Sequence, residues 1–167
     1  MRALILTYFI TVFLSVAVAQ DNQLSNSFKK DQTIDRYLFV TSKLSDQDLI
    51  ELAAQANIAK MTLVLSGFID PSSAGLEHTK LKIAKINQAC CGENGPTWLI
   101  HPQLFDKFDV KQIPSFVISK KNIKSKGDFA KVTGIMSVQN ALKFIYAGAL
   151  DPQIKAASKA AYQRFPI

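Results

Sequence analysis

The chain carries two kinds of hydrophobic pattern: short continuous apolar runs, and longer stretches in which apolar residues recur every three or four positions. The first kind is typical of buried strands and the second of amphipathic helices. We therefore expect strands at residues 36–41, 61–65, 98–100, 115–119 and 129–133. Helices are expected after Ser45, across residues 76–90, over 102–107, after Ser137 and from Asp151 onward. This alternation predicts an α/β domain whose first three strands are joined by right-handed crossovers.

Residues at the expected helix ends support this assignment. Ser45 precedes Asp48 by three positions, a spacing that predicts a capped helix start. Ser137 is a second candidate cap, and Asp151 with a proline directly after it is a third. Gly92 follows the helical face that contains Leu76, Ile83, Ile86 and Cys90, where a glycine can end a helix in a left-handed conformation.

The first 19 residues have the layout of a secretory signal peptide. Arg2 is followed by an apolar run that ends in Ala17-Val18-Ala19, which predicts cleavage after Ala19. The alternative is a membrane anchor, but the run is shorter than the roughly 20 residues that a spanning helix needs. We expect export without stable membrane insertion once residues 1–19 are removed. Residues 20–33 are expected to form a flexible leader, and residues 34–167 one domain with a C-terminal helical extension.

The charge balance is basic, with 20 Lys and Arg against 13 Asp and Glu and a formal net charge of +7. Four lysines crowd one expected turn: Lys120, Lys121, Lys124 and Lys126. We favour a solvated turn that keeps the strand pair soluble, and a patch for acidic partners or membrane headgroups is the alternative. Aromatic side chains do not alternate with these lysines, so we do not expect nucleic-acid binding.

Three segments carry a resemblance to a known family. Residues 39–45 read Phe-Val-Thr-Ser-Lys-Leu-Ser, residues 65–67 read Leu-Ser-Gly, and residues 100–114 begin Ile-His-Pro-Gln-Leu-Phe and end in Ile113-Pro114. From residue 37 to residue 147 the chain resembles the TrbC proteins of F-type conjugative type IV secretion systems, which are exported factors needed for pilin assembly. The chain departs from the family pattern at Ser45, Ser66 and His101, where relatives carry proline, arginine and aspartate.

The resemblance implies a thioredoxin-like three-layer sandwich, a mixed central sheet with helices on both faces, and a cis peptide bond before Pro114. Redox-active proteins of that fold place a Cys-x-x-Cys pair opposite this proline, whereas residues 42–45 here contain no cysteine. We therefore expect a non-enzymatic periplasmic assembly factor without a cofactor, whose partner is a TraW-like protein or pilin. The candidate groove residues are Ser42, Lys43, Ser45, Ser66, Ile113 and Pro114.

Cys90 and Cys91 are the two cysteines of the chain. Adjacent helical side chains point about 100° apart, so we favour inert thiols, with one filling the core and the other more exposed. A disulfide between them or with another chain, and a thiol-disulfide oxidoreductase or isomerase built on the pair, are the alternatives. With only His78 and His101 as further ligands we expect no metal site, and we expect His101 to cap or cover the helix at 102–107.

Overall fold

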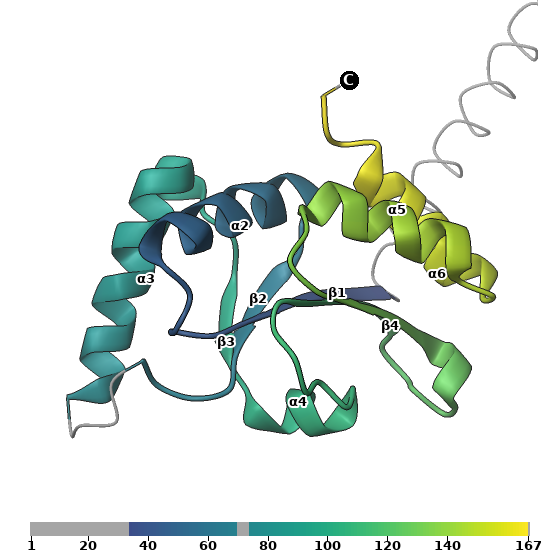
Figure 1. Cartoon of the computed structure of the whole chain (residues 1–167), viewed down its shortest axis with the longest axis horizontal. Helices are drawn as coiled ribbons and strands as arrows, with labels where there is room; N and C mark the ends of the chain where they lie inside the picture. The colour runs from purple at the N-terminus through teal and green to yellow at the C-terminus, as the bar shows by residue number, and fades with distance from the viewer. Residues whose placement is uncertain (1–33, 70–73, 167) are drawn as a thin grey trace, which may run out of the picture. The chain divides into compact units, whose positions relative to one another are not determined.

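The computed structural model describes residues 34–69 and 74–166, and the predicted signal peptide and leader lie outside these ranges. Its centre is a five-stranded mixed sheet in the order β3-β2-β1-β4-β5 (Figure 1). β1 pairs in parallel with β2 and β2 with β3, whereas β4 runs antiparallel to β1 and β5. The strands are β1 Ile34–Val40, β2 Thr62–Leu65, β3 Trp98–Ile100, β4 Ser115–Lys120 and β5 Phe129–Thr133. The predicted α/β class is confirmed.

The helices alternate with the strands in the predicted order. They are α2 Asp46–Ala59, α3 Gly75–Cys91, α4 Pro102–Lys107, α5 Val138–Gly148 and α6 Pro152–Tyr162, with short 3-10 turns η1 Gly92–Asn94 and η2 Lys126–Asp128. The first strand begins two residues earlier than predicted, because Ile34 and Asp35 pair with Lys120 and Ser119 of β4. That extension depends on a partner strand far along the chain, which a local pattern does not reveal.

Three helix starts use the predicted caps. The side-chain oxygen of Ser45 accepts from the Asp48 backbone N–H, and Ser137 accepts in the same way from Asn140. Asp151 accepts from the first-turn N–H groups of α6. Each cap satisfies a donor that would otherwise lack an intrahelical partner, which is why these local signals fixed the helix starts.

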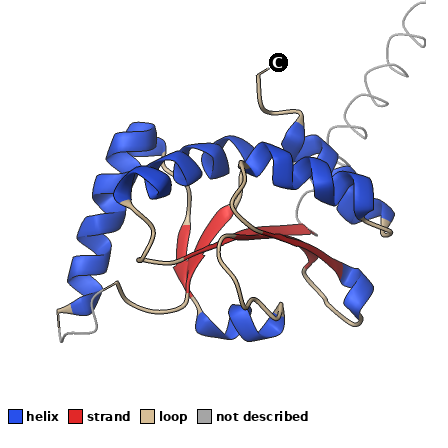
Figure 2. Cartoon of the chain, in the orientation of Figure 1, coloured by secondary structure: helices blue, strands red, loops and turns tan. Residues whose placement is uncertain are grey.

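Helices lie on both faces of the sheet (Figure 2). The larger core joins the sheet to α2, α5 and α6 through residues such as Leu49, Phe116 and Leu142. The smaller core lies beneath α4, where Phe39 and Phe108 are fully buried with their ring centroids 6.0 Å apart. The sheet is therefore closed from both sides by hydrophobic burial.

Helix α3 is buried by neighbouring elements less completely than its periodic apolar residues suggest. Leu76 shares a helical face with Ile86, yet it is 44% exposed and Leu81 is 60% exposed, whereas Ile86 is buried. Figure 1 shows α3 beside α2, toward one end of the layer of helices. Because α3 packs mainly on α2, only a narrow stripe of its surface is buried.

A candidate binding groove beside Pro114

The strand register brings three connecting loops to one end of the sheet. Val40 at the end of β1 pairs with Leu65 at the end of β2, and Phe39 pairs with Ser115 at the start of β4. The segments that follow β1 and β2 and the one that precedes β4 therefore meet at this end. The Ile113-Pro114 peptide bond is cis, as the resemblance implied.

A cavity of about 450 Å³ opens beside Pro114. Leu44 and the buried Pro114 line it together with two walls, one from α2 and one from the loop that precedes α5. We call this cavity the Pro114 groove. The α2 wall consists of Asp48, Glu51, Leu52 and Gln55, and the loop wall consists of Ile135, Met136 and Ser137.

The two walls are joined by a hydrogen bond between distant parts of the sequence. Gln55 Oε1 accepts from the backbone N–H of Val138, the first residue of α5, at 2.8 Å. The α2 residues of the groove follow helical spacing, so all four share one stripe of that helix. The Gln55 contact holds the loop wall opposite this stripe.

The groove combines apolar surface with two carboxylates. Ile135 is 97% exposed, which is unusual for a large aliphatic side chain. Asp48 and Glu51 are exposed, and Asp48 Oδ2 accepts from the hydroxyl of Ser45 at 2.6 Å. Glu51 Oε1 accepts from Gln47 Nε2 at 3.1 Å. Both carboxylates thus accept hydrogen bonds from neutral side chains.

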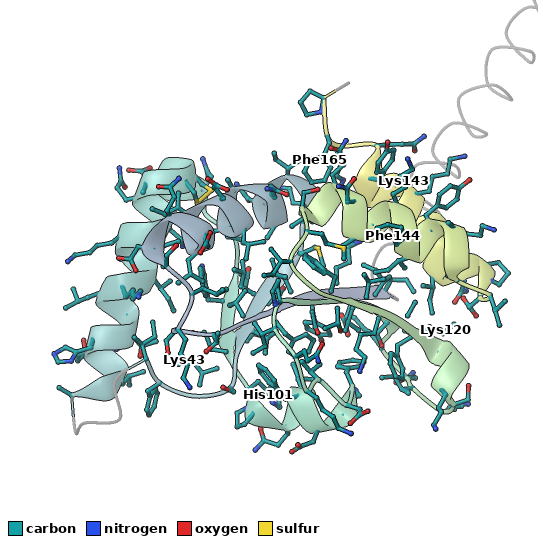
Figure 3. The ribbon with its side chains drawn as sticks, viewed as in Figure 1. Lys43, His101, Lys120, Lys143, Phe144 and Phe165 are labelled. Atoms are coloured by element: carbon teal, nitrogen blue, oxygen red, sulfur yellow. A yellow bond between two sulfur atoms is a disulfide. The ribbon has the colours of Figure 1, made fainter. Side chains whose placement is uncertain are left out.

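The six predicted groove residues take different positions. Pro114 lines the cavity, whereas Ser45 is exposed and its hydroxyl caps α2. Ser42 and Ile113 are half-buried, while Ser66 and Lys43 (Figure 3) are exposed. These four and Ser45 are not among the lining residues. The stripe Asp48, Glu51, Leu52 and Gln55 could have been found from its helical spacing. The loop wall could not, because its place opposite α2 depends on tertiary contacts.

Cys90 and Cys91 form a disulfide with each other, so the favoured interpretation as inert thiols was wrong. The argument from helical geometry failed because α3 ends at this point: Cys91 has φ −148°, outside the helical range. Both residues are half-buried, and Cys90 packs against the larger core. The pair does not line the Pro114 groove.

The two histidines that the structure describes lie outside the Pro114 groove. His101 lies directly before α4 (Figure 3), but its side chain does not cap the helix, and only its backbone carbonyl accepts from Leu104. His78 is exposed on α3, where it lines a second cavity of about 480 Å³ between α2 and α3. Across residues 34–69 and 74–166, we find no group of three or more His, Cys, Asp or Glu that could hold a metal ion.

The lysine-rich turn is partly neutralised within the fold. Lys120 (Figure 3) forms ion pairs with both Asp128 and Asp151, linking the β4–β5 turn to the start of α6. Hydrogen bonds from the backbone N–H groups of Lys124 and Ser125, and from Lys120, lower the pKa of Asp128. The hydrogen bond from Lys120 also lowers the pKa of Asp151, and both carboxylates raise the pKa of Lys120.

The family comparison identifies the biological process. Residues 38–145 match the family described as type-F conjugative transfer system pilin assembly protein. The chain belongs to this TrbC family. No curated protein and no solved structure matches the chain. As a TrbC-family member, the protein takes part in the assembly of F-type conjugative pili.

The described helices are all too short or too polar to cross a lipid bilayer.

Proposed function

We propose that this TrbC-family protein is a non-enzymatic assembly factor of the conjugative pilus that acts through protein–protein contacts in the periplasm. Membership of the family supports the role in pilus assembly. The signal-like residues 1–19 support export, and cell fractionation of a tagged chain tests the location. A TraW-like periplasmic component or pilin is the partner we expect.

We also propose that the domain is thioredoxin-like. The unit β1-α2-β2 is followed, after α3, β3 and α4, by the antiparallel pair β4-β5 and then α5, and this order supports the assignment. Pro114 directly precedes β4 at the end of the sheet where α2 begins. The segment before α2 contains serines rather than cysteines, so the scaffold retains a binding position without the usual electron-carrying thiols.

The single observation that carries the proposal is the exposed apolar rim of the Pro114 groove. Ile135 is almost fully exposed beside the half-buried Leu44 and Met136 at the mouth of a 450 Å³ cavity. Removing a side chain of this kind from water stabilises a complex by about 1.5–3 kcal/mol. If a segment of a partner protein covers Ile135, the complex is stabilised by about this free energy relative to the free protein, in which Ile135 stays in water.

Replacing the exposed side chain tests this function. Ile135→Ser should lower plasmid transfer and pilus assembly about tenfold or more, because burial of the isoleucine in the complex is lost. Leu150→Ser is the matched control, since Leu150 is 96% exposed at the opposite end of α5 and lies outside the groove. Both variants should unfold at the wild-type temperature. Equal transfer by the two variants would contradict the proposal.

The Cys90–Cys91 disulfide favours a second candidate function, a thiol-disulfide oxidoreductase or isomerase. A substrate thiolate would attack one sulfur, forming a mixed disulfide and releasing the other cysteine as a thiolate. Replacing both cysteines with alanine separates the two functions. Wild-type pilus assembly by this double variant supports the assembly factor, whereas loss of assembly together with loss of insulin or glutathione turnover supports the enzyme.

A further inference from the structure

We propose that the Pro114 groove selects a partner segment in which a lysine or arginine lies within a few residues of a large aliphatic side chain. This inference rests on the proposed function and specifies the chemistry of the partner. The aliphatic side chain would pack against Ile135 and Met136, and the cation would face the carboxylates of Asp48 and Glu51.

The charges of the groove favour a cation. Asp48 and Glu51 are its acidic lining residues, and no lysine, arginine or histidine lines it. Their positions, three residues apart on α2, place their Cβ atoms about 5–6 Å apart, so one cationic head group can interact with both. An acidic segment in the same place would meet like charges at short distance, which disfavours it.

The carboxylates of the groove differ from those acids of the fold that pair with lysines. Asp46 pairs with Lys82, Glu77 with Lys80, and Asp109 with Lys111, each at about 3 Å. Within the described residues, Asp48 and Glu51 form no such ion pair, although the chain as a whole carries a net charge of +7. The groove is therefore a local site of negative charge on a basic protein.

The apolar part of the groove suits the stem of a long basic side chain. Lysine and arginine can lay their methylene groups along apolar surface while their charged ends reach a carboxylate. The half-buried Leu44 and Met136 provide such surface, and the flexible Met136 can adapt to segments of different shape. Charge and apolar contact thus act on the same partner segment.

Photo-crosslinking in donor cells tests the inference. The full chain carries p-benzoylphenylalanine at position 135, and mass spectrometry identifies the segment that becomes attached. We expect a segment of another conjugation protein with Lys or Arg within about three residues of the attachment point. In an extended segment every second side chain points to the same face, so a basic residue at that distance can reach the carboxylates. A segment that lacks a basic residue would overturn the inference. Attachment to residues 20–33 of the same chain, or to a second copy, would also overturn it.

A charge reversal adds a quantitative test. Glu51→Lys should lower the yield of this cross-link about fivefold, because attraction becomes repulsion at the groove wall. Glu93→Lys makes the same change in net charge at an exposed position on η1 and should leave the yield unchanged. Equal yields for the two variants would overturn the inference. If a conjugation protein is still captured in that case, the proposed function stands; if no protein is captured and Ile135→Ser transfers normally, the function itself fails.

Discussion

Two pairs of carboxylates in this protein have opposite roles. Asp128 and Asp151 share one lysine, Lys120, and their side chains are only 16% and 18% exposed. Asp48 and Glu51 are exposed on α2 and receive hydrogen bonds from neutral side chains. The first pair forms ion pairs within the fold, and these link the β4–β5 turn to α6. The second pair keeps its charge at the mouth of an apolar groove, where a partner can use it.

The comparison shows that residue type alone does not separate structural charges from binding charges. All four acids accept hydrogen bonds from groups nearby in the sequence. The difference is that the tertiary structure places a lysine beside Asp128 and Asp151. Lys120 is 31 positions away from Asp151 in sequence, and only the packing of α6 against β4 brings them together.

The largest effect should come from Gln55, which holds the groove walls together. Gln55→Leu removes the acceptor of the Val138 N–H and should lower the free energy of unfolding by about 1–3 kcal/mol. Urea denaturation measures the change. Gln55→Glu retains a side-chain oxygen at the same place and is the matched control. If the leucine variant is as stable as the wild type, the hydrogen bond does not support the groove.

Loss of Lys120 should have a smaller effect, confined to stability. Lys120→Met leaves Asp128 and Asp151 facing each other without their shared cation and should lower the unfolding temperature by several degrees. Lys121→Met is the control, because Lys121 is the adjacent exposed lysine and forms no ion pair within the described residues. Plasmid transfer should stay at the wild-type level, since the cluster lies outside the Pro114 groove. Equal unfolding temperatures for the two variants would show that the ion pairs contribute nothing.

The smallest effect should be on how the unfolding temperature falls at acid pH. The pKa values of Asp128 and Asp151 are lower in the folded state than the usual value near 4, so their contribution is complete above about pH 4 and is lost as the pH falls through the folded pKa values. Unfolding temperatures measured from pH 7 to pH 2 should therefore fall less steeply for Lys120→Met than for the wild type. Parallel curves would contradict this assignment.

Much of the fold followed from local signals. The order of strands and helices was predictable because hydrophobic period and capping residues such as Ser45, Ser137 and Asp151 act within one turn of the chain. The Pro114 position was found from the segment around it. Ile135 was missed as a groove residue, because nothing in its own neighbourhood indicates that it lies opposite α2. The Cys90–Cys91 disulfide was disfavoured because the argument assumed helical backbone angles at Cys91, where φ is −148°.

The sequence by itself determined the α/β class, the order of the elements and the resemblance to the TrbC family. These depend on periodicity, caps and short motifs, whose physical causes lie within a few residues. The tertiary structure alone decided which carboxylates are neutralised by lysine and which line a groove. The decisive contacts, Gln55 with Val138 and Lys120 with Asp151, join segments that only chain folding brings within hydrogen-bonding distance.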